Sequence, residues 1–276
     1  MRIEIAGHTY HIEAAGPPSS DTVLMLHGFA QSTDTWSQVA EALACDLRVV
    51  LLDLIGHGGS ARPRDPEPYR IDDMVAMIDQ LRDALGLTRL HLVGYSMGGR
   101  IALCHAAQHP ERVASVVLES ASFGPDSDAE RALYAARDTE LAARLRASTP
   151  EEFAAYWEAL PLFARERSLP AHLQSQAHAM RLGNDMESLA LTVEGSGQAQ
   201  MPNLRPFLRH ARMPLLYVHG SQDAKYTALA RELAHSHGLD VMEFPTGHNV
   251  HLEQPEAFAR TVRALVDRTY EERPDD

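Results

Sequence analysis

The chain has 276 residues, of which 45% are hydrophobic and 23% are charged, proportions that exclude a disordered, collagenous or low-complexity protein. Its longest apolar runs, such as residues 49–52, are far shorter than the roughly 18 residues of a membrane span, and residues 1–10 show no apolar run typical of a signal peptide or anchor. The 38 acidic and 25 basic residues give a net charge of −13 without a basic stripe, so we expect a cytoplasmic protein that binds a small molecule and neither nucleic acid nor a membrane surface.

The first predicted elements are two antiparallel strands, at residues 2–5 and 10–14 around Gly7. Further β-rich runs follow at residues 22–27, 47–54, 90–95, 113–119, 214–220 and 240–245. Several of these runs are continuously apolar, which is typical of parallel strands covered on both faces. Helical patterns lie between them, for example at residues 71–85, with Asp72 as the expected N-cap and Gly86 just past the end. The alternation predicts an α/β protein with a mostly parallel central sheet flanked by helices.

The alternation stops between Gly124 and Arg212, a stretch rich in Ala, Leu, Arg and Glu that shows no convincing strand. Prolines 150, 161, 170 and 202 divide it into helix-sized pieces. We therefore expect an α/β core at residues 1–123 and 213–276, with a helical lid inserted at residues 124–212. The two cysteines, Cys45 and Cys104, lie in apolar helix-like segments, and we expect both to be buried free thiols.

A nucleophile motif follows the predicted strand at residues 90–95. Gly94, Ser96 and Gly98 form G-x-S-x-G, and a helix is predicted directly afterwards at residues 101–108. A strand, a sharp strained turn and a helix are the context in which this motif presents a reactive serine. The alternative is a tight turn whose serine caps the helix.

Partners for Ser96 follow in the order expected of a Ser-Asp-His triad. Asp223 and His248 each come just after a predicted strand, so all three side chains are expected at one edge of the sheet. The backbone N–H groups of Phe29 and Met97 are the predicted oxyanion hole, which would hold negative charge developing on an oxygen. The alternative for the segment around Phe29 is a simple turn that ends a strand.

Other kinds of site have little support in the sequence. His248 with His251, and His235 with His237, are closely spaced, but no Cys or carboxylate cluster completes a metal site. No G-x-G-x-x-G follows a strand, which disfavours a dinucleotide site. The glycine-rich loop at residues 53–60 is interpreted as structural. We predict neither a metal nor a cofactor.

Five segments of the sequence point to one family within this class of enzymes. They are LVGYSMGGR at residues 92–100, WEALPLF at 157–163, MRLGN at 180–184, DAKY at 223–226 and GHNVHLEQP at 247–255. Together they resemble the 2-succinyl-6-hydroxy-2,4-cyclohexadiene-1-carboxylate synthase family of menaquinone biosynthesis, over about residues 22–258. The resemblance implies an α/β-hydrolase fold and a lyase that eliminates pyruvate from a cyclohexene carrying several carboxylates. It also implies that Ser96 with His248 acts as a base towards an acidic C–H group, without a cofactor.

The same resemblance implies a set of substrate-binding residues. Tyr95, Arg100, Trp157 and Arg181 match family positions, and the arginines suit a polyanionic carboxylate substrate because guanidinium binds carboxylates bidentately. A further lid arginine maps to Arg131 or, with another gap placement, to Tyr134, with Arg137 nearby. The alternatives are surface or ion-paired arginines, and a tryptophan that belongs to the core of the lid.

Two other functions remain open from the residues alone. A carboxylesterase or C–C bond hydrolase would use Ser96 as a covalent nucleophile, and the triad permits this equally well. A non-catalytic ligand-binding member of the fold is disfavoured, because it would not need an intact Ser, Asp and His. The oligomeric state is not predicted.

Overall fold

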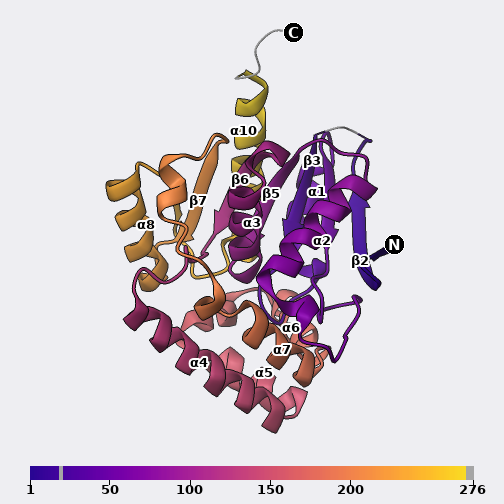
Figure 1. The fold of residues 1–276 in the computed structure, drawn as a ribbon, viewed down its shortest axis with the longest axis vertical. Coiled ribbons are helices and arrows are strands. Elements are labelled where there is room, and N and C mark those ends of the chain that lie inside the picture. Colours follow the sequence, from indigo (N-terminus) through magenta and orange to yellow (C-terminus); the bar gives the residue numbers. More distant parts are fainter. Residues whose placement is uncertain (19–20, 272–276) are drawn as a thin grey trace.

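The computed structural model describes residues 1–18 and 21–271, which form one eight-stranded sheet in the order β1-β2-β4-β3-β5-β6-β7-β8 (Figure 1). The strands are β1 (Arg2–Ile5), β2 (His8–Ala15), β3 (Thr22–Leu26), β4 (Arg48–Leu52), β5 (Leu90–Tyr95), β6 (Val113–Glu119), β7 (Leu215–Gly220) and β8 (Asp240–Phe244). Strands β3 to β8 are parallel where they pair, whereas β2 pairs antiparallel with both β1 and β4. The predicted α/β class with a mostly parallel sheet is confirmed.

The central strands are buried along their whole length because helices cover both faces of the sheet. Every residue of β3, β5 and β6 is buried. One apolar core contains residues of α2 (Ile71–Ala84), α3 (Met97–Gln108) and α8 (Ala224–His237), and the other contains residues of α1 (Ser37–Leu43) and α10 (Pro255–Glu271). This two-sided burial explains why these strands are apolar without alternation.

Two sequence expectations about local structure are wrong. The N-cap of α2 is Arg70, in an extended conformation with ψ 148°, so Asp72 lies inside the first turn, where its carboxylate faces the positive end of the helix dipole. Cys45 is exposed, because α1 ends at Leu43 and the chain turns to the surface before β4. Cys104 is buried in α3, and burial raises the pKa of its thiol to about 12.

Helices alone occupy the chain between β6 and β7, where every residue is described. They are α4 (Asp128–Ala147), α5 (Pro150–Ala159), α6 (Ala171–Leu182) and α7 (Met186–Ser196), with short 3₁₀ segments between them. Figure 1 shows them gathered at one end of the sheet. Ala30, which follows β3, packs with Phe153 of α5 and Leu189 of α7, so this is the end where the parallel strands finish. Residues 124–212 are called the lid segment below.

The long helices of the protein are amphipathic or mixed in character. Within residues 1–18 and 21–271, no helix combines the length and the apolar composition that crossing a membrane requires.

Candidate active site

Ser96 stands in the sharp turn between β5 and α3. Its backbone has φ +50° and ψ −105°, a left-handed conformation that is costly for a residue with a Cβ and is found mainly at functional turns. The Ser96 N–H donates to the carbonyl oxygen of Glu119 at 2.8 Å, which fixes the turn to the end of β6. The strained strand-turn-helix geometry is that of a nucleophile elbow.

The glycines on either side of Ser96 are required by close backbone contacts. A Cβ at Gly98 would overlap the carbonyl oxygen of Leu26 in β3, and one at Gly94 would lie 2.5 Å from the carbonyl oxygen of Gly98. The first turn of α3 therefore packs backbone against backbone on the sheet, which a side chain at either position would prevent.

His248 and Asp223 form a short buried hydrogen bond. The His248 Nδ1 lies 2.6 Å from Oδ2 of Asp223, and both residues are buried. The other carboxylate oxygen, Oδ1, accepts from the backbone N–H of Tyr226 at 3.2 Å, because Asp223 is also the N-cap of α8. Since an ionised carboxylate only accepts hydrogen bonds, Nδ1 of His248 carries the hydrogen and Nε2 is left as the proton acceptor.

A single cavity at this end of the sheet brings most of the predicted residues together. Eight of the ten predicted site residues line it: Phe29, Tyr95, Ser96, Met97, Arg100, Trp157, Arg181 and His248. Asp223 lies behind His248 and does not need to reach the cavity. The walls come from both the sheet edge and the lid segment, so a ligand in the cavity would contact both.

The predicted oxyanion-hole donors face no competing acceptor. Met97 is the first residue of α3, and its N–H precedes the first intrahelical bond, which Arg100 donates to the Ser96 carbonyl at 3.1 Å. In the described part of the chain, the N–H groups of Phe29 and Met97 donate to no protein atom. Ser96 Oγ likewise makes no hydrogen bond there, so its side chain can rotate towards His248 or a ligand.

The two predicted arginines differ in how they are neutralised. The Nη1 of Arg100 donates to the carbonyl oxygen of Ser196 at 2.6 Å, and no carboxylate of the described residues lies within ion-pair distance. Burial lowers the pKa of the Arg100 guanidinium. A half-buried guanidinium without an ion-paired carboxylate, at the wall of a cavity, is a favourable site for an anion.

Arg181 already has two carboxylate partners. It is 4% exposed, its Nη2 lies 2.5 Å from Oε2 of Glu166, and its Nη1 lies 3.2 Å from Oε1 of Glu158. The expected alternative of an ion-paired arginine is thus realised, although Arg181 still lines the cavity. Any anion bound there would share the guanidinium with these carboxylates.

The third arginine expected in the lid does not reach the cavity. Arg131 donates through Nη1 to the carbonyl oxygens of Ala199 and Met201, and it lines a different depression on the surface. Tyr134, the other gap placement, donates to Glu130 at 2.6 Å. Burial and the neighbouring carboxylate of Glu130 raise the pKa of Tyr134. The side chain of Arg131 is already committed to backbone carbonyls, so we leave it out of the proposed site.

Trp157 combines the two roles that the sequence left open. It lines the cavity, and its ring also packs against those of Phe29, Phe153 and Phe163, at centroid distances of 5.2, 5.4 and 5.6 Å. The indole therefore also belongs to an apolar cluster formed by the lid segment and the turn after β3.

Sequence reasoning missed several polar residues of the cavity wall, among them Gln31, Asp138 and Lys225. Lys225 is the only lysine in the chain and follows Asp223 by two positions, so its place at the same sheet edge was available as a signal. Burial lowers the pKa of its ammonium group. Gln31 accepts a hydrogen bond from Gly28 N at 3.1 Å and lies just after the predicted oxyanion-hole residue Phe29.

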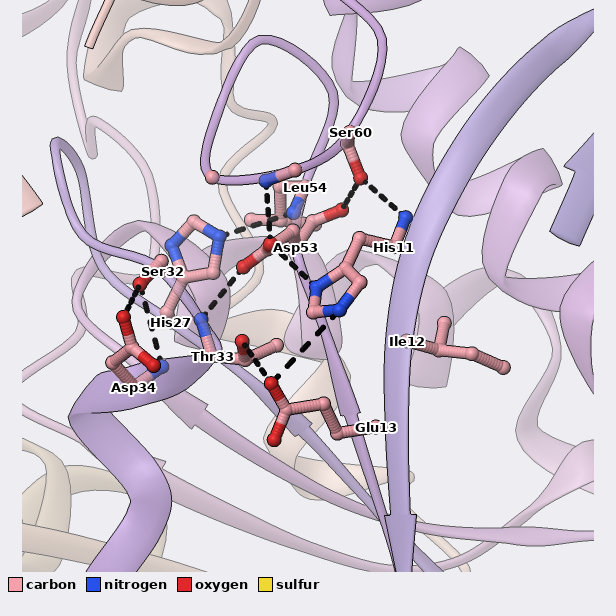
Figure 2. A network of polar contacts seen from close by, with 12 residues as sticks. His11, Ile12, Glu13, His27, Ser32, Thr33, Asp34, Asp53, Leu54 and Ser60 are labelled. Atoms are coloured by element: carbon pink, nitrogen blue, oxygen red, sulfur yellow. Dashed lines mark hydrogen bonds and ion pairs between the residues drawn. The ribbon is translucent and has the colours of Figure 1, made fainter. Parts of the chain in front are cut away.

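The glycine-rich loop supports the site from behind. Figure 2 shows the Asp53 carboxylate at the centre of a polar network in which it accepts from Thr33 N at 2.6 Å and Gly59 N at 2.8 Å. His11 Nδ1 lies 2.9 Å from the same carboxylate. These bonds tie the loop after β4 to the segment after β3, which carries Phe29. The side chains of Asp53 and Ser60 are both hydrogen-bonded within the protein, in keeping with a structural role.

Comparisons with known proteins agree with this geometry. A family profile described as alpha/beta hydrolase fold matches residues 21–255. The protein is thus an enzyme of the α/β-hydrolase fold class.

Individual relatives and solved structures indicate which family within this fold class the chain belongs to. A protein of Escherichia coli O1:K1 named 2-succinyl-6-hydroxy-2,4-cyclohexadiene-1-carboxylate synthase is 33% identical over 252 residues, which cover 91% of this chain and 96% of the relative. The structure of MenH from S. aureus matches with a TM-score of 0.87 and 28% identity, covering 95% of this chain and 98% of that one. An esterase from Thermogutta terrifontis matches with a TM-score of 0.81 and 25% identity, covering 98% and 99%. The chain belongs to the 2-succinyl-6-hydroxy-2,4-cyclohexadiene-1-carboxylate synthase family.

Proposed function

We propose that this enzyme eliminates pyruvate from 2-succinyl-5-enolpyruvyl-6-hydroxy-3-cyclohexene-1-carboxylate and so forms 2-succinyl-6-hydroxy-2,4-cyclohexadiene-1-carboxylate. The observation that carries the proposal is the presence of two arginines, the half-buried Arg100 and the buried Arg181, in the wall of the cavity that also holds Ser96 and His248. A polyanionic substrate needs such cations, particularly on a protein of net charge −13. The names of the relatives support the same reaction.

In the proposed mechanism, Ser96 and His248 act together as the base. His248 Nε2 takes the hydroxyl proton of Ser96 while Ser96 Oγ removes the acidic ring C–H proton, and Asp223 stabilises the imidazolium that forms. The electron pair of the broken C–H bond moves into an enolate-like system whose oxygen accepts from the N–H groups of Phe29 and Met97. The ring double bond then forms as the C–O bond to enolpyruvate breaks. The departing enolpyruvate takes up the proton held by His248 to become pyruvate, which returns the base to its starting state.

The core and the lid segment together supply the remaining contacts in this proposal. Arg100 on α3 of the core and Arg181 on α6 of the lid segment bind substrate carboxylates. Trp157 and Tyr95 form apolar walls that exclude water from the developing charge. In this mechanism Ser96 only transfers a proton, and no acyl group becomes attached to it.

A second candidate function is ester or C–C bond hydrolysis with Ser96 as a covalent nucleophile. The strained elbow and the His248–Asp223 hydrogen bond favour it as well, and the likeness to the Thermogutta terrifontis esterase points the same way. The two functions differ in chemistry, because hydrolysis passes through an acyl-enzyme and elimination does not.

The deciding experiment incubates the enzyme with the enolpyruvyl cyclohexene precursor and follows pyruvate release, with a neutral aryl ester as the comparator. We expect efficient pyruvate release, slow ester hydrolysis and an unmodified intact mass during turnover. Fast ester hydrolysis without pyruvate release, together with a competent adduct on Ser96, would establish the hydrolase instead.

A further inference from the structure

A second histidine–carboxylate pair lies beside the candidate active site, and the proposed mechanism does not use it. Glu119 is the last residue of β6, and His251 lies in α9 (Val250–Glu253), three residues after His248. Both residues are 0% exposed. The His251 Nδ1 lies 2.9 Å from Oε1 and 2.8 Å from Oε2 of Glu119, and the backbone N–H of His251 donates to Oε1 at 3.2 Å. On the other side of the ring, Nε2 lies 2.8 Å from Thr35 Oγ1.

Glu119 links the two halves of the proposed base. Its backbone carbonyl oxygen accepts from Ser96 N at 2.8 Å, which holds the strained elbow against β6. Its carboxylate holds the backbone and the ring of His251, and so fixes the turn that carries His248. One residue therefore sets the separation between Ser96 and His248 through two short, rigid connections.

The ring of Tyr95 transmits the same restraint. Its centroid lies 4.7 Å from that of His251 and 5.2 Å from that of His248, so the ring packs against both imidazoles. It also packs against Gly28, where an added Cβ would lie 2.5 Å from Tyr95 Cε1. A shift of His251 would therefore move Tyr95 and, with it, both His248 and the turn that presents the Phe29 N–H.

We propose that Glu119 and His251 are positioning residues, which hold Ser96, His248 and Tyr95 in the arrangement that proton transfer requires. Neither side chain is part of the cavity wall, so neither touches substrate in this proposal. A buried pair of this kind contributes little to stability compared with apolar residues of the same size, whereas its directional hydrogen bonds fix geometry. The inference rests on the proposed role of Ser96 and His248 as the base.

The main test replaces the carboxylate by its uncharged isostere, Glu119→Gln, and measures pyruvate release. We expect kcat to fall about 10- to 100-fold with little change in KM, the size of effect seen when a group that orients a reactive side chain is removed. The matched control is Ser115→Ala on the same strand, which removes the buried hydrogen bond between Ser115 Oγ and His91 Nδ1, 2.9 Å long, nearer the other end of β6. We expect this control to leave kcat and KM unchanged.

An NMR measurement without substrate tests this inference independently of the proposed function. The imidazole N–H protons of His248 and His251 should give two downfield proton resonances. The Asp223→Asn variant assigns that of His248, and the His251→Gln variant assigns that of His251. We expect Glu119→Gln to shift the His248 resonance as well as that of His251, and Ser115→Ala to shift neither. If Glu119→Gln does not fold, Thr35→Val removes only the hydroxyl bonded to His251 Nε2, and the same shift of the His248 resonance is expected.

The outcomes differ for the two proposals. An unmoved His248 resonance in a folded Glu119→Gln or Thr35→Val protein overturns the positioning role, as does wild-type kcat in Glu119→Gln. Equal loss of kcat in Glu119→Gln and Ser115→Ala overturns it too, because the effect would then come from general loosening of β6. Absence of pyruvate release from the wild-type enzyme would instead contradict the proposed function, and the resonances would still decide the positioning role.

Discussion

The sheet edge and the lid segment contribute to one cavity but hold their residues by different means. At the sheet edge, Ser96 is fixed by a strained backbone and by glycines that allow no side chain, and His248 is fixed by a 2.6 Å hydrogen bond to Asp223. In the lid segment, Arg181 is held by ion pairs to Glu158 and Glu166. The proposed reacting groups at the sheet edge are therefore held by backbone geometry and one short hydrogen bond, whereas Arg181 in the lid segment is held by ion pairs between side chains alone.

The largest expected effect tests the sheet edge. Ser96→Ala, Asp223→Asn and His248→Ala should each lower kcat for pyruvate release on the order of 10⁴-fold, because the three groups act as one proton-transfer unit. Steady-state kinetics gives the loss, and thermal unfolding checks that each variant is folded. Full activity in a folded Ser96→Ala protein would contradict the mechanism.

The next effect tests the two arginines in the cavity wall as binding groups for substrate carboxylates. Arg100→Ala and Arg181→Ala should each cost about 2 to 4 kcal/mol in kcat/KM for the anionic substrate, the range for truncating one partner of a buried charge pair. Lysine at either position should rescue only part of the loss, since it keeps the charge without the bidentate geometry. The measurement is kcat/KM for the precursor and for a neutral ester.

Arg131→Ala is the matched control, because Arg131 is a lid arginine bonded to backbone carbonyls away from the cavity. We expect its kcat/KM to equal that of the wild type. Equal losses on the anionic and the neutral substrate in Arg100→Ala or Arg181→Ala would argue against carboxylate binding.

A smaller effect tests the backbone packing of the elbow. Gly98→Ala places a Cβ against the carbonyl oxygen of Leu26, which belongs to a rigid central strand, so we expect a loss of about 1 to 3 kcal/mol in the free energy of unfolding. Gly183→Ala in the lid segment is the control, since its Cβ would lie 3.5 Å from the nearest atom, the Ala179 carbonyl oxygen. Urea denaturation measures both. A Gly98→Ala protein as stable as the wild type would show that the elbow can shift.

The smallest effect concerns buried histidines that the site does not use. His105 is 0% exposed, neither ring nitrogen makes a hydrogen bond, and burial lowers its pKa to about 4. Below pH 6.5 the unfolded chain binds a proton that the folded protein does not, so this residue contributes stability above pH 6.5 that is lost as the pH falls towards 4. The loss between pH 8 and pH 5 is about 2 kcal/mol.

The variant His105→Leu should therefore narrow the difference in Tm between pH 8 and pH 5. His235→Gln is the control, because His235 is exposed and should leave the difference unchanged. Burial lowers the pKa of His57 to about 3. Because both variants retain His57, part of the loss of stability at low pH should remain in each. An unchanged difference in His105→Leu would contradict the assignment.

The sequence predicted the parts of this protein that depend on local pattern. Continuous apolar runs identified the parallel strands, and the spacing of Gly94, Ser96 and Gly98 identified the elbow, because close backbone contacts leave no choice of residue there. The order of Asp223 and His248 after their strands was sufficient to place them at one sheet edge, and their hydrogen bond is present in the structure.

Only the tertiary structure decided how the polar side chains are shared. The sequence could not distinguish Arg131, bonded to backbone carbonyls, from Arg100, which has no carboxylate partner, because both are arginines on helical patterns. It also gave no sign that Glu119 and His251, 132 positions apart, form a buried pair beside His248. Hydrogen bonds and ion pairs depend on the distance and direction between atoms, and those are fixed only when the strands and the lid segment pack together.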